Sequence, residues 1–259
     1  MEEKSLNVSP RTLLEEADGL LERLESESIF FRSEAFKPHL GIAMKVIFIT
    51  GLGRSGTNLL DLILDSHSQI QGLGEIQALS SAYEHKHKTC TCGSSSLRTC
   101  DFWSRVNAHL KEKTGRSISS LNLESRDEGT FKEDNRIFFE TAAEVSGKPY
   151  LTDNSKTPRR LRRLLALPEI EVIPIHVQRD VRGYAYSQFK RKRQLIGPAF
   201  TYSMRHLALY RLLHNREHVV LEYEQFSRDT ERILKQLLQK LHLDFEPALL
   251  HWAKQVHHN

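Results

Sequence analysis

The sequence predicts an α/β domain with about five mostly parallel strands flanked by helices. The first observation is the apolar run Val46 to Thr50, which lacks helical periodicity and is typical of a buried parallel strand. The second is the glycine-containing loop at 51–56, and the third is the leucine-rich helix predicted after it. The order strand, glycine loop and helix points several backbone N–H groups and a helix N-terminus toward one bound anion. Residues 45–60 therefore predict an anion-binding loop.

Four further strands are predicted at 70–73, 149–152, 171–178 and 218–223. Pro174 predicts a bulge in the fourth strand of the chain, because proline cannot donate a hydrogen bond to a neighbouring strand. The segment 111–130 is polar and is predicted to be a mobile surface segment. Helices are predicted at 9–27, 134–146, 158–167 and 230–241.

Length and composition restrict the domain organisation and the location of the protein. The chain has 259 residues, of which 39% are hydrophobic and 27% are charged, as expected for one domain with a small appendage. We expect residues 1–44 to form an N-terminal helical appendage and residues 45–259 the α/β domain, in which 83–130 are an insertion beside the acceptor. No signal-peptide pattern and no membrane-spanning stretch is found, which predicts a cytoplasmic protein.

The positive charge favours an anionic ligand over a nucleic acid. The net charge is +4, and basic residues gather at 159–163 and 190–193. The simplest interpretation of both clusters is a solvated helix face, and for the second cluster nuclear targeting or nucleic-acid binding is the alternative. No aromatic-rich module of the kind that binds nucleic acids accompanies them, so no nucleic-acid partner is predicted.

The residues of the loop restrict the kind of anion. Gly51 and Gly56 have the spacing of a nucleoside-triphosphate loop, but Thr57 and Asn58 stand where that loop has its lysine and its Mg²⁺-binding hydroxyl. The cation lies inside the loop, at Arg54, which favours a compact anion held without metal. A P-loop kinase is one alternative. The other is a non-catalytic module that binds nucleotides or polyanions through its basic surface.

The run Gly-x-Gly-Arg-Ser-Gly-Thr-x-Leu-Leu resembles the 5′-phosphosulfate loop of sulfotransferases that use 3′-phosphoadenosine 5′-phosphosulfate (PAPS). The resemblance implies a P-loop-like fold and a donor site that includes Gly53, Arg54, Ser55, Gly56, Thr57 and Asn58. Asn58 departs from the usual second hydroxyl of that family.

Glu75 follows Arg54 by 21 residues, a distance that allows one helix and a return strand. The pattern Arg-Ser-Gly-Thr … Gly-Glu resembles the tyrosyl-protein and carbohydrate sulfotransferases, where the matching glutamate is taken as the general base. Three histidines are also bases by type, but we expect them to be core or turn residues: His67, His176 and His206.

Two later patterns add to the resemblance. Lys156 lies in an Asn-x-Lys-x-Pro context, where the family lysine reaches the transferring sulfuryl group. Arg179 and Ser187 are eight residues apart, as in the family motif for the 3′-phosphate, although Val181 replaces its proline. An arginine fork and a hydroxyl suit a dianionic phosphate.

The resemblance therefore implies a PAPS-dependent sulfotransferase that acts on an acceptor hydroxyl of a carbohydrate, a tyrosine or a small molecule. Its catalytic residues would be Glu75, Arg54 and Lys156, and no metal is required for transfer.

All three cysteines lie within residues 83–103. A zinc site formed by these cysteines with His85 and His87 is one interpretation. However, Cys-x-Cys is shorter than the usual structural spacing, and no second Cys/His pair follows at zinc-finger distance. The pattern Cys-x-Cys-Gly … Cys-x-Phe-Trp also resembles a segment of bacterial sulfotransferases. We therefore expect reduced thiols in a structural flap near the acceptor, and a metal site or a disulfide among Cys90, Cys92 and Cys100 stays open as an alternative.

Overall fold

The computed structural model describes residues 44–85, 88–192 and 196–258. Within these residues, five strands form one sheet in the order β2-β3-β1-β4-β5, and every pairing between them is parallel. This architecture confirms the predicted α/β fold class. The strands are β1 (Lys45–Gly51), β2 (Ile70–Gln71), β3 (Tyr150–Lys156), β4 (Glu171–Gln178) and β5 (Val219–Glu222).

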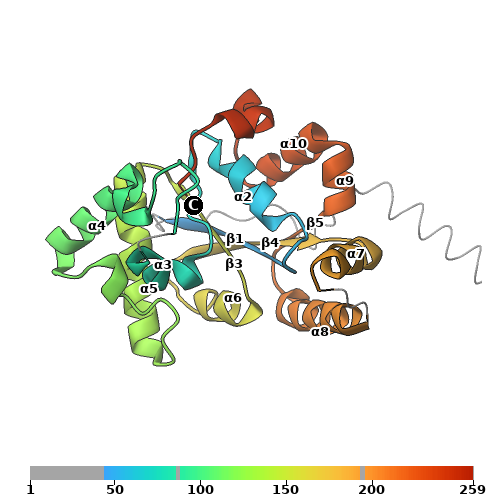
Figure 1. Cartoon of the computed structure of the whole chain (residues 1–259), viewed down its shortest axis with the longest axis horizontal. Helices are drawn as coiled ribbons and strands as arrows, with labels where there is room; N and C mark the ends of the chain where they lie inside the picture. The colour runs from blue at the N-terminus through green and yellow to red at the C-terminus, as the bar shows by residue number, and fades with distance from the viewer. Residues whose placement is uncertain (1–43, 86–87, 193–195, 259) are drawn as a thin grey trace, which may run out of the picture.

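Helices cover both faces of the sheet (Figure 1). The α-helices are α2 (Thr57–Asp65), α3 (Leu79–Glu84), α4 (Asp101–Thr114), α5 (Glu128–Ser146), α6 (Pro158–Leu164), α7 (Val181–Lys192), α8 (Ile196–Leu213), α9 (Tyr223–Arg228) and α10 (Thr230–Lys240). The described residues also contain the 3-10 helices η1 (Ile76–Ala78), η2 (Leu97–Thr99), η3 (Ile118–Ser120) and η4 (Pro247–Lys254).

The alternation of side chains along β1 divides the core into two halves. Ile47 and Ile49 pack in the half that contains α2, α9 and α10. Val46 and Phe48 pack in the other half, with α3, α4, α5, α6 and α8. Both faces of β1 are therefore buried, which explains why its sequence is continuously apolar.

Three local predictions differ from the structure. The segment 111–130 is not wholly a surface segment: α4 continues to Thr114, α5 begins at Glu128, and apolar residues of the connection between them, such as Leu121, are buried. Strand β3 continues past Thr152 to Lys156, because its polar residues pair with β1. Pro174 causes no bulge in the β1–β4 pairing, and the pairing of β4 with β5 begins one residue later, at Ile175.

The predicted N-terminal helix at 9–27 lies outside the described residues. In the part of the chain that the structure describes, no helix combines the length and the apolar character needed to cross a bilayer.

Candidate active site

The loop between β1 and α2 passes close to other parts of the backbone. Gly51 has φ 151°, and a Cβ there would lie 2.5 Å from the carbonyl oxygen of Val177. Gly56 has φ 88°, and a Cβ there would overlap the ring of Tyr223. Arg54 also has a positive φ, of 81°, which is uncommon for a residue with a side chain. The two glycines are therefore required by the conformation of the loop.

A cavity of about 430 Å³ lies over this loop and the N-terminus of α2. Three basic side chains line it, Arg54, Lys156 and Arg179, against a single carboxylate, that of Glu75. The remaining lining residues are Gly53, Gly56, Thr57, Asn58, Leu59 and Tyr223. Excess positive charge at a helix N-terminus favours an anionic ligand.

Arg179 connects the end of β4 to the loop. One of its terminal nitrogens donates a hydrogen bond of 2.6 Å to the carbonyl oxygen of Arg54, and its guanidinium lies 4.7 Å from the ring centre of Tyr223. Its Nε is buried and has no hydrogen-bond partner among the described residues. Because Arg179 lines the anion cavity, its guanidinium can bind an anionic ligand there.

Ser187 lies on α7, where its hydroxyl accepts a 3.2 Å hydrogen bond from Nε of Arg54. The structure therefore brings Arg54, Arg179 and Ser187 together, although Ser187 does not line the cavity. Asp180 closes the turn into α7 by accepting a bond from the backbone of Arg182. Hydrogen bonds from the Arg182 side chain lower the pKa of Asp180 to about 2, so this carboxylate stays ionised.

Lys156 and Glu75 form an ion pair at the edge of the cavity. A register shift between β1 and β3 places Lys156 opposite Thr50, whose hydroxyl donates to the Lys156 carbonyl at 3.0 Å. Glu75 comes from a different part of the chain, where it immediately precedes η1. Both side chains thus lie at the carboxyl edge of the sheet, where open α/β sheets bind ligands.

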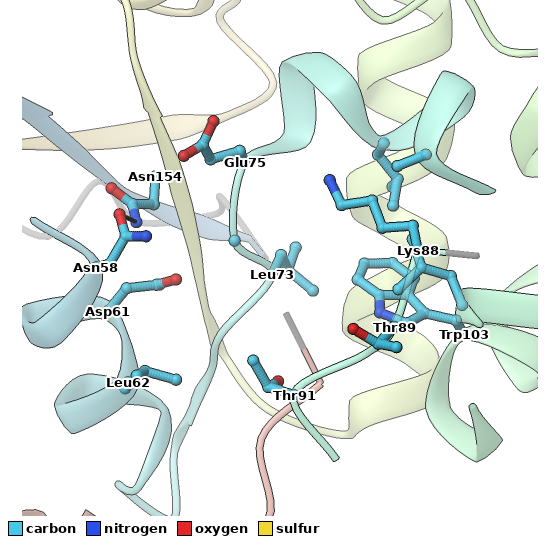
Figure 2. Close-up of a pocket in the computed structure, with 14 residues that line it drawn as sticks. Asn58, Asp61, Leu62, Leu73, Glu75, Lys88, Thr89, Thr91, Trp103 and Asn154 are labelled. Carbon is cyan, nitrogen blue, oxygen red and sulfur yellow. Dashed lines mark hydrogen bonds between the residues drawn. The ribbon is translucent and has the colours of Figure 1, made fainter. Parts of the chain in front are cut away.

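A second cavity, of about 310 Å³, lies between α2 and the segment 88–103 (Figure 2). Its wall is apolar at Leu73, Leu79, Leu97 and Trp103, and Lys88 adds a cation at its rim. Two residues, Asn58 and Glu75, line both this cavity and the anion cavity. Asn58 accepts a 3.1 Å hydrogen bond from Nδ2 of Asn154, which also lines the second cavity.

Several residues of these cavities were missing from the predicted site: Tyr223, Asn154, Lys88 and Trp103. Asn154 lies only two residues before Lys156, but the register shift between β1 and β3 falls between Asp153 and Lys156, so strand alternation could not place its side chain. Among the predicted donor residues, Ser55 is buried and does not line the anion cavity.

The three histidines considered as bases lie elsewhere. His67, His176 and His206 line neither the anion cavity nor the second one. His176 is buried on β4, and this burial, together with nearby histidines, lowers its pKa to about 3.

Below the site, Arg160 joins β3 to the helices behind the sheet. It is fully buried, and its Nε donates to the buried carboxylate of Asp153 at 2.7 Å. Its terminal nitrogens donate to Glu124 at 2.8 Å, to Asn135 at 2.7 Å and to a backbone carbonyl. The expectation of a solvated helix face is therefore wrong for Arg160.

Comparison with known proteins identifies the family. A profile of the sulfotransferase family matches residues 46–247, which is most of the chain. The chain belongs to the sulfotransferase family. None of the curated proteins matches this sulfotransferase significantly.

Two solved structures share the fold of this sulfotransferase. The sulfotransferase domain of the Synechococcus PCC 7002 olefin synthase is 18% identical with a TM-score of 0.54, over 86% of this chain and 82% of that one. The sulfotransferase domain from the curacin biosynthetic pathway is 19% identical with a TM-score of 0.53, over 82% of this chain and 78% of that one.

Proposed function

We propose that this sulfotransferase uses PAPS as donor and transfers the sulfuryl group to an acceptor hydroxyl, with Glu75 as general base. The observation that carries the proposal is the position of Glu75, which lines both the anion cavity and the second cavity. A base must reach the acceptor proton while the acceptor oxygen meets the donor, so it belongs where two substrate cavities adjoin.

The donor would occupy the anion cavity. The backbone N–H groups of the loop and the N-terminus of α2 would bind the 5′-phosphosulfate, beside Arg54. Arg179 and Ser187, which both contact Arg54, would bind the 3′-phosphate. The position of Arg179 in the lining of the anion cavity supports this assignment.

Catalysis would depend mainly on charge stabilisation. Arg54 and Lys156 lie in the same cavity and would stabilise negative charge that develops on the sulfuryl oxygens and the departing phosphate. Glu75 would take the acceptor proton as the acceptor oxygen forms its bond to sulfur. Its ion pair with Lys156 would hold both groups at the cavity edge before the substrates bind.

The acceptor would occupy the second cavity. Its wall, which includes Leu73 and Trp103, suits the apolar part of an acceptor, while Asn58 and Asn154 offer polar contacts near Glu75. This chemistry is compatible with the hydroxyl of a tyrosine, a small molecule or a sugar.

Calorimetric titration with adenosine 3′,5′-bisphosphate tests the donor assignment. We expect metal-independent binding of this product, tighter than that of adenosine 5′-phosphate or of ATP with Mg²⁺. A preference for ATP with Mg²⁺ would overturn the proposal in favour of a kinase. If binding occurs but sulfuryl transfer to a panel of phenolic, sugar and aliphatic alcohols does not, the non-catalytic alternative gains support.

Replacing Arg179 with alanine should weaken binding of adenosine 3′,5′-bisphosphate by about 2–5 kcal/mol, since the 3′-phosphate loses a charged partner. Binding of adenosine 5′-phosphate, which lacks that group, should change much less. Arg182→Ala is the matched control, because Arg182 lies three residues after Arg179, in the first turn of α7, and its side chain is 89% exposed. Equal losses for both nucleotides would show that Arg179 supports the loop instead of binding the 3′-phosphate.

A further inference from the structure

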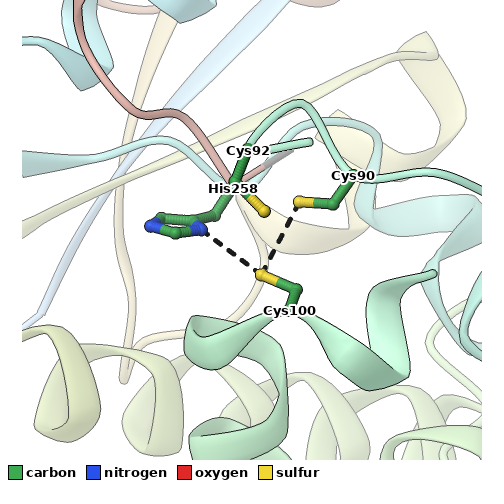
Figure 3. Close-up of side chains that lie close together, drawn as sticks. All are labelled: Cys90, Cys92, Cys100 and His258. Carbon is green, nitrogen blue, oxygen red and sulfur yellow. Dashed lines mark hydrogen bonds between the residues drawn. The ribbon is translucent and has the colours of Figure 1, made fainter. Parts of the chain in front are cut away.

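The three cysteines and a distant histidine converge on one point (Figure 3). Cys90 and Cys92 come from the turn after α3, Cys100 immediately precedes α4, and His258 comes from the segment after η4. One possible ligand atom from each of the four lies within 4.8 Å of all the others. His258 is 158 residues away from Cys100, so no spacing in the chain indicates that it belongs to this set.

The spacing of these atoms suits a tetrahedral metal ion. Sγ of Cys90 lies 3.6 Å from Sγ of Cys100, and Sγ of Cys100 lies 3.3 Å from Nδ1 of His258. Bond lengths of about 2.3 Å for Zn–S and 2.0–2.1 Å for Zn–N give tetrahedron edges of roughly 3.8 Å between sulfurs and roughly 3.6 Å between sulfur and nitrogen. These two distances are thus within a few tenths of an ångström of zinc geometry, and the other pairs of ligand atoms lie within 4.8 Å of each other.

The surroundings hold the four side chains in place. The turn 90–94 is closed by two backbone hydrogen bonds, from Gly93 N to Cys90 O at 3.0 Å and from Cys90 N to Ser94 O at 3.1 Å. Gly93 has φ 91°, which allows this tight turn. Cys92 and the Ser94 hydroxyl lie 3.1 Å apart, so this hydroxyl can donate to a thiolate.

His258 is held by contacts independent of the cysteines. Its ring stacks on Phe102 with 5.5 Å between ring centres, and its carbonyl oxygen accepts a hydrogen bond from Nε1 of Trp103. The preceding residue, His257, contacts the carboxylate of Asp65 at 2.7 Å and the carbonyl of Trp252 at 2.7 Å. Cys100 is buried and is held at the N-terminal end of α4.

We propose that Cys90, Cys92, Cys100 and His258 bind one structural zinc ion, which fastens the segment 88–103 to the C-terminal segment. Three thiolates and one imidazole form a closed tetrahedral set without an open position, so the ion takes no part in sulfuryl transfer. This assignment replaces the expectation of reduced thiols with the metal alternative.

The position of the zinc site links it to the second cavity. Thr89 and Thr91, on either side of Cys90, line that cavity, as do Leu97 and Trp103, on either side of Cys100. Without the ion, among the described residues only the contacts of Phe102 and Trp103 with His258 would attach this wall to the C-terminal segment. Zinc loss should therefore loosen this wall and leave the loop that follows β1 in place.

The test is the metal content of the full chain, purified under reducing conditions and without a metal-affinity step. Elemental analysis should find about one zinc ion per chain. After the zinc is removed with a chelator and a thiol reagent, and the reagent is reversed, Co²⁺ should restore one equivalent of binding. It should give the visible absorption of tetrahedral cobalt and thiolate-to-metal charge-transfer bands.

His258→Ala should weaken zinc affinity by more than about 100-fold, since even supporting residues contribute 10–100-fold. His251→Ala is the matched control, because His251 is an exposed histidine of the same C-terminal region, and it should retain full zinc content. Zinc removal should also lower the Tm of the wild-type chain, a readout independent of activity and of any variant.

Three results would overturn the proposal. One is wild-type protein that lacks zinc and binds no added Zn²⁺ or Co²⁺ after reduction. Another is a disulfide between Cys90 and Cys100, found by mass spectrometry in protein prepared under reducing conditions. The third is equal loss of zinc in the His251 and His258 variants.

Discussion

Glu75→Gln is expected to lower kcat for sulfuryl transfer by about 10²–10⁴-fold, the contribution of a positioned general base. Glutamine preserves the size of the side chain and a hydrogen-bonding oxygen toward Lys156, but it cannot accept the acceptor proton. Affinity for adenosine 3′,5′-bisphosphate should be unchanged or tighter, because the substitution removes the one carboxylate that lines the anion cavity. Steady-state kinetics and calorimetry on the same preparation measure the two effects.

Glu84→Gln provides the matched control, because Glu84 is exposed at the end of α3 and lines neither cavity. Its kcat and nucleotide affinity should equal those of the wild type. Near-normal turnover in the Glu75 variant would remove Glu75 from the mechanism. A parallel loss of nucleotide binding would instead indicate that Glu75 organises the donor cavity.

Arg160→Met is expected to destabilise the protein by about 3–5 kcal/mol, the usual result of removing one partner from a buried ion pair. Asp153 is 0% exposed and would keep its charge without the partner that now lies 2.7 Å away. Asn135 and the carbonyl of Leu123 would lose hydrogen bonds as well. The free energy of unfolding, from urea or guanidinium titration monitored by circular dichroism, measures the change.

Arg159→Met is the control for this prediction. Arg159 precedes Arg160 in α6 but is exposed, so its substitution should change stability by no more than about 0.5 kcal/mol. Similar effects of the two substitutions would mean that the buried network contributes little. A stability loss in the Arg160 variant with normal nucleotide binding after refolding would separate its structural role from the site.

The local sequence was sufficient to predict those features that depend only on residues close together in the chain. The apolar residues of β1, the glycines of the following loop and the start of α2 lie within one short stretch, and their conformation matches the predicted strand, loop and helix. Arg179 directly follows β4, and Ser187 lies about two helical turns further on, in α7. Both residues contact Arg54. The parallel order of the strands also followed from their alternation with helices.

The tertiary structure decided which charged residues are buried and which residues from distant parts of the chain lie together. In sequence, Arg160 resembles its solvated neighbours, and only the packing of α5 and β3 around it shows that it is an internal ion-pair residue. Glu75 was predicted near the loop, but its pairing with Lys156 depends on where β2 and β3 end.

The sequence by itself therefore determined the fold class, the anion-binding loop and the residue types that this loop presents, because these depend on hydrophobic period and on backbone freedom within short segments. The tertiary structure decided that Glu75 lies between two cavities and that His258 joins three cysteines. Such contacts form when the core buries apolar surface from distant segments, and no spacing within one segment encodes the resulting distances.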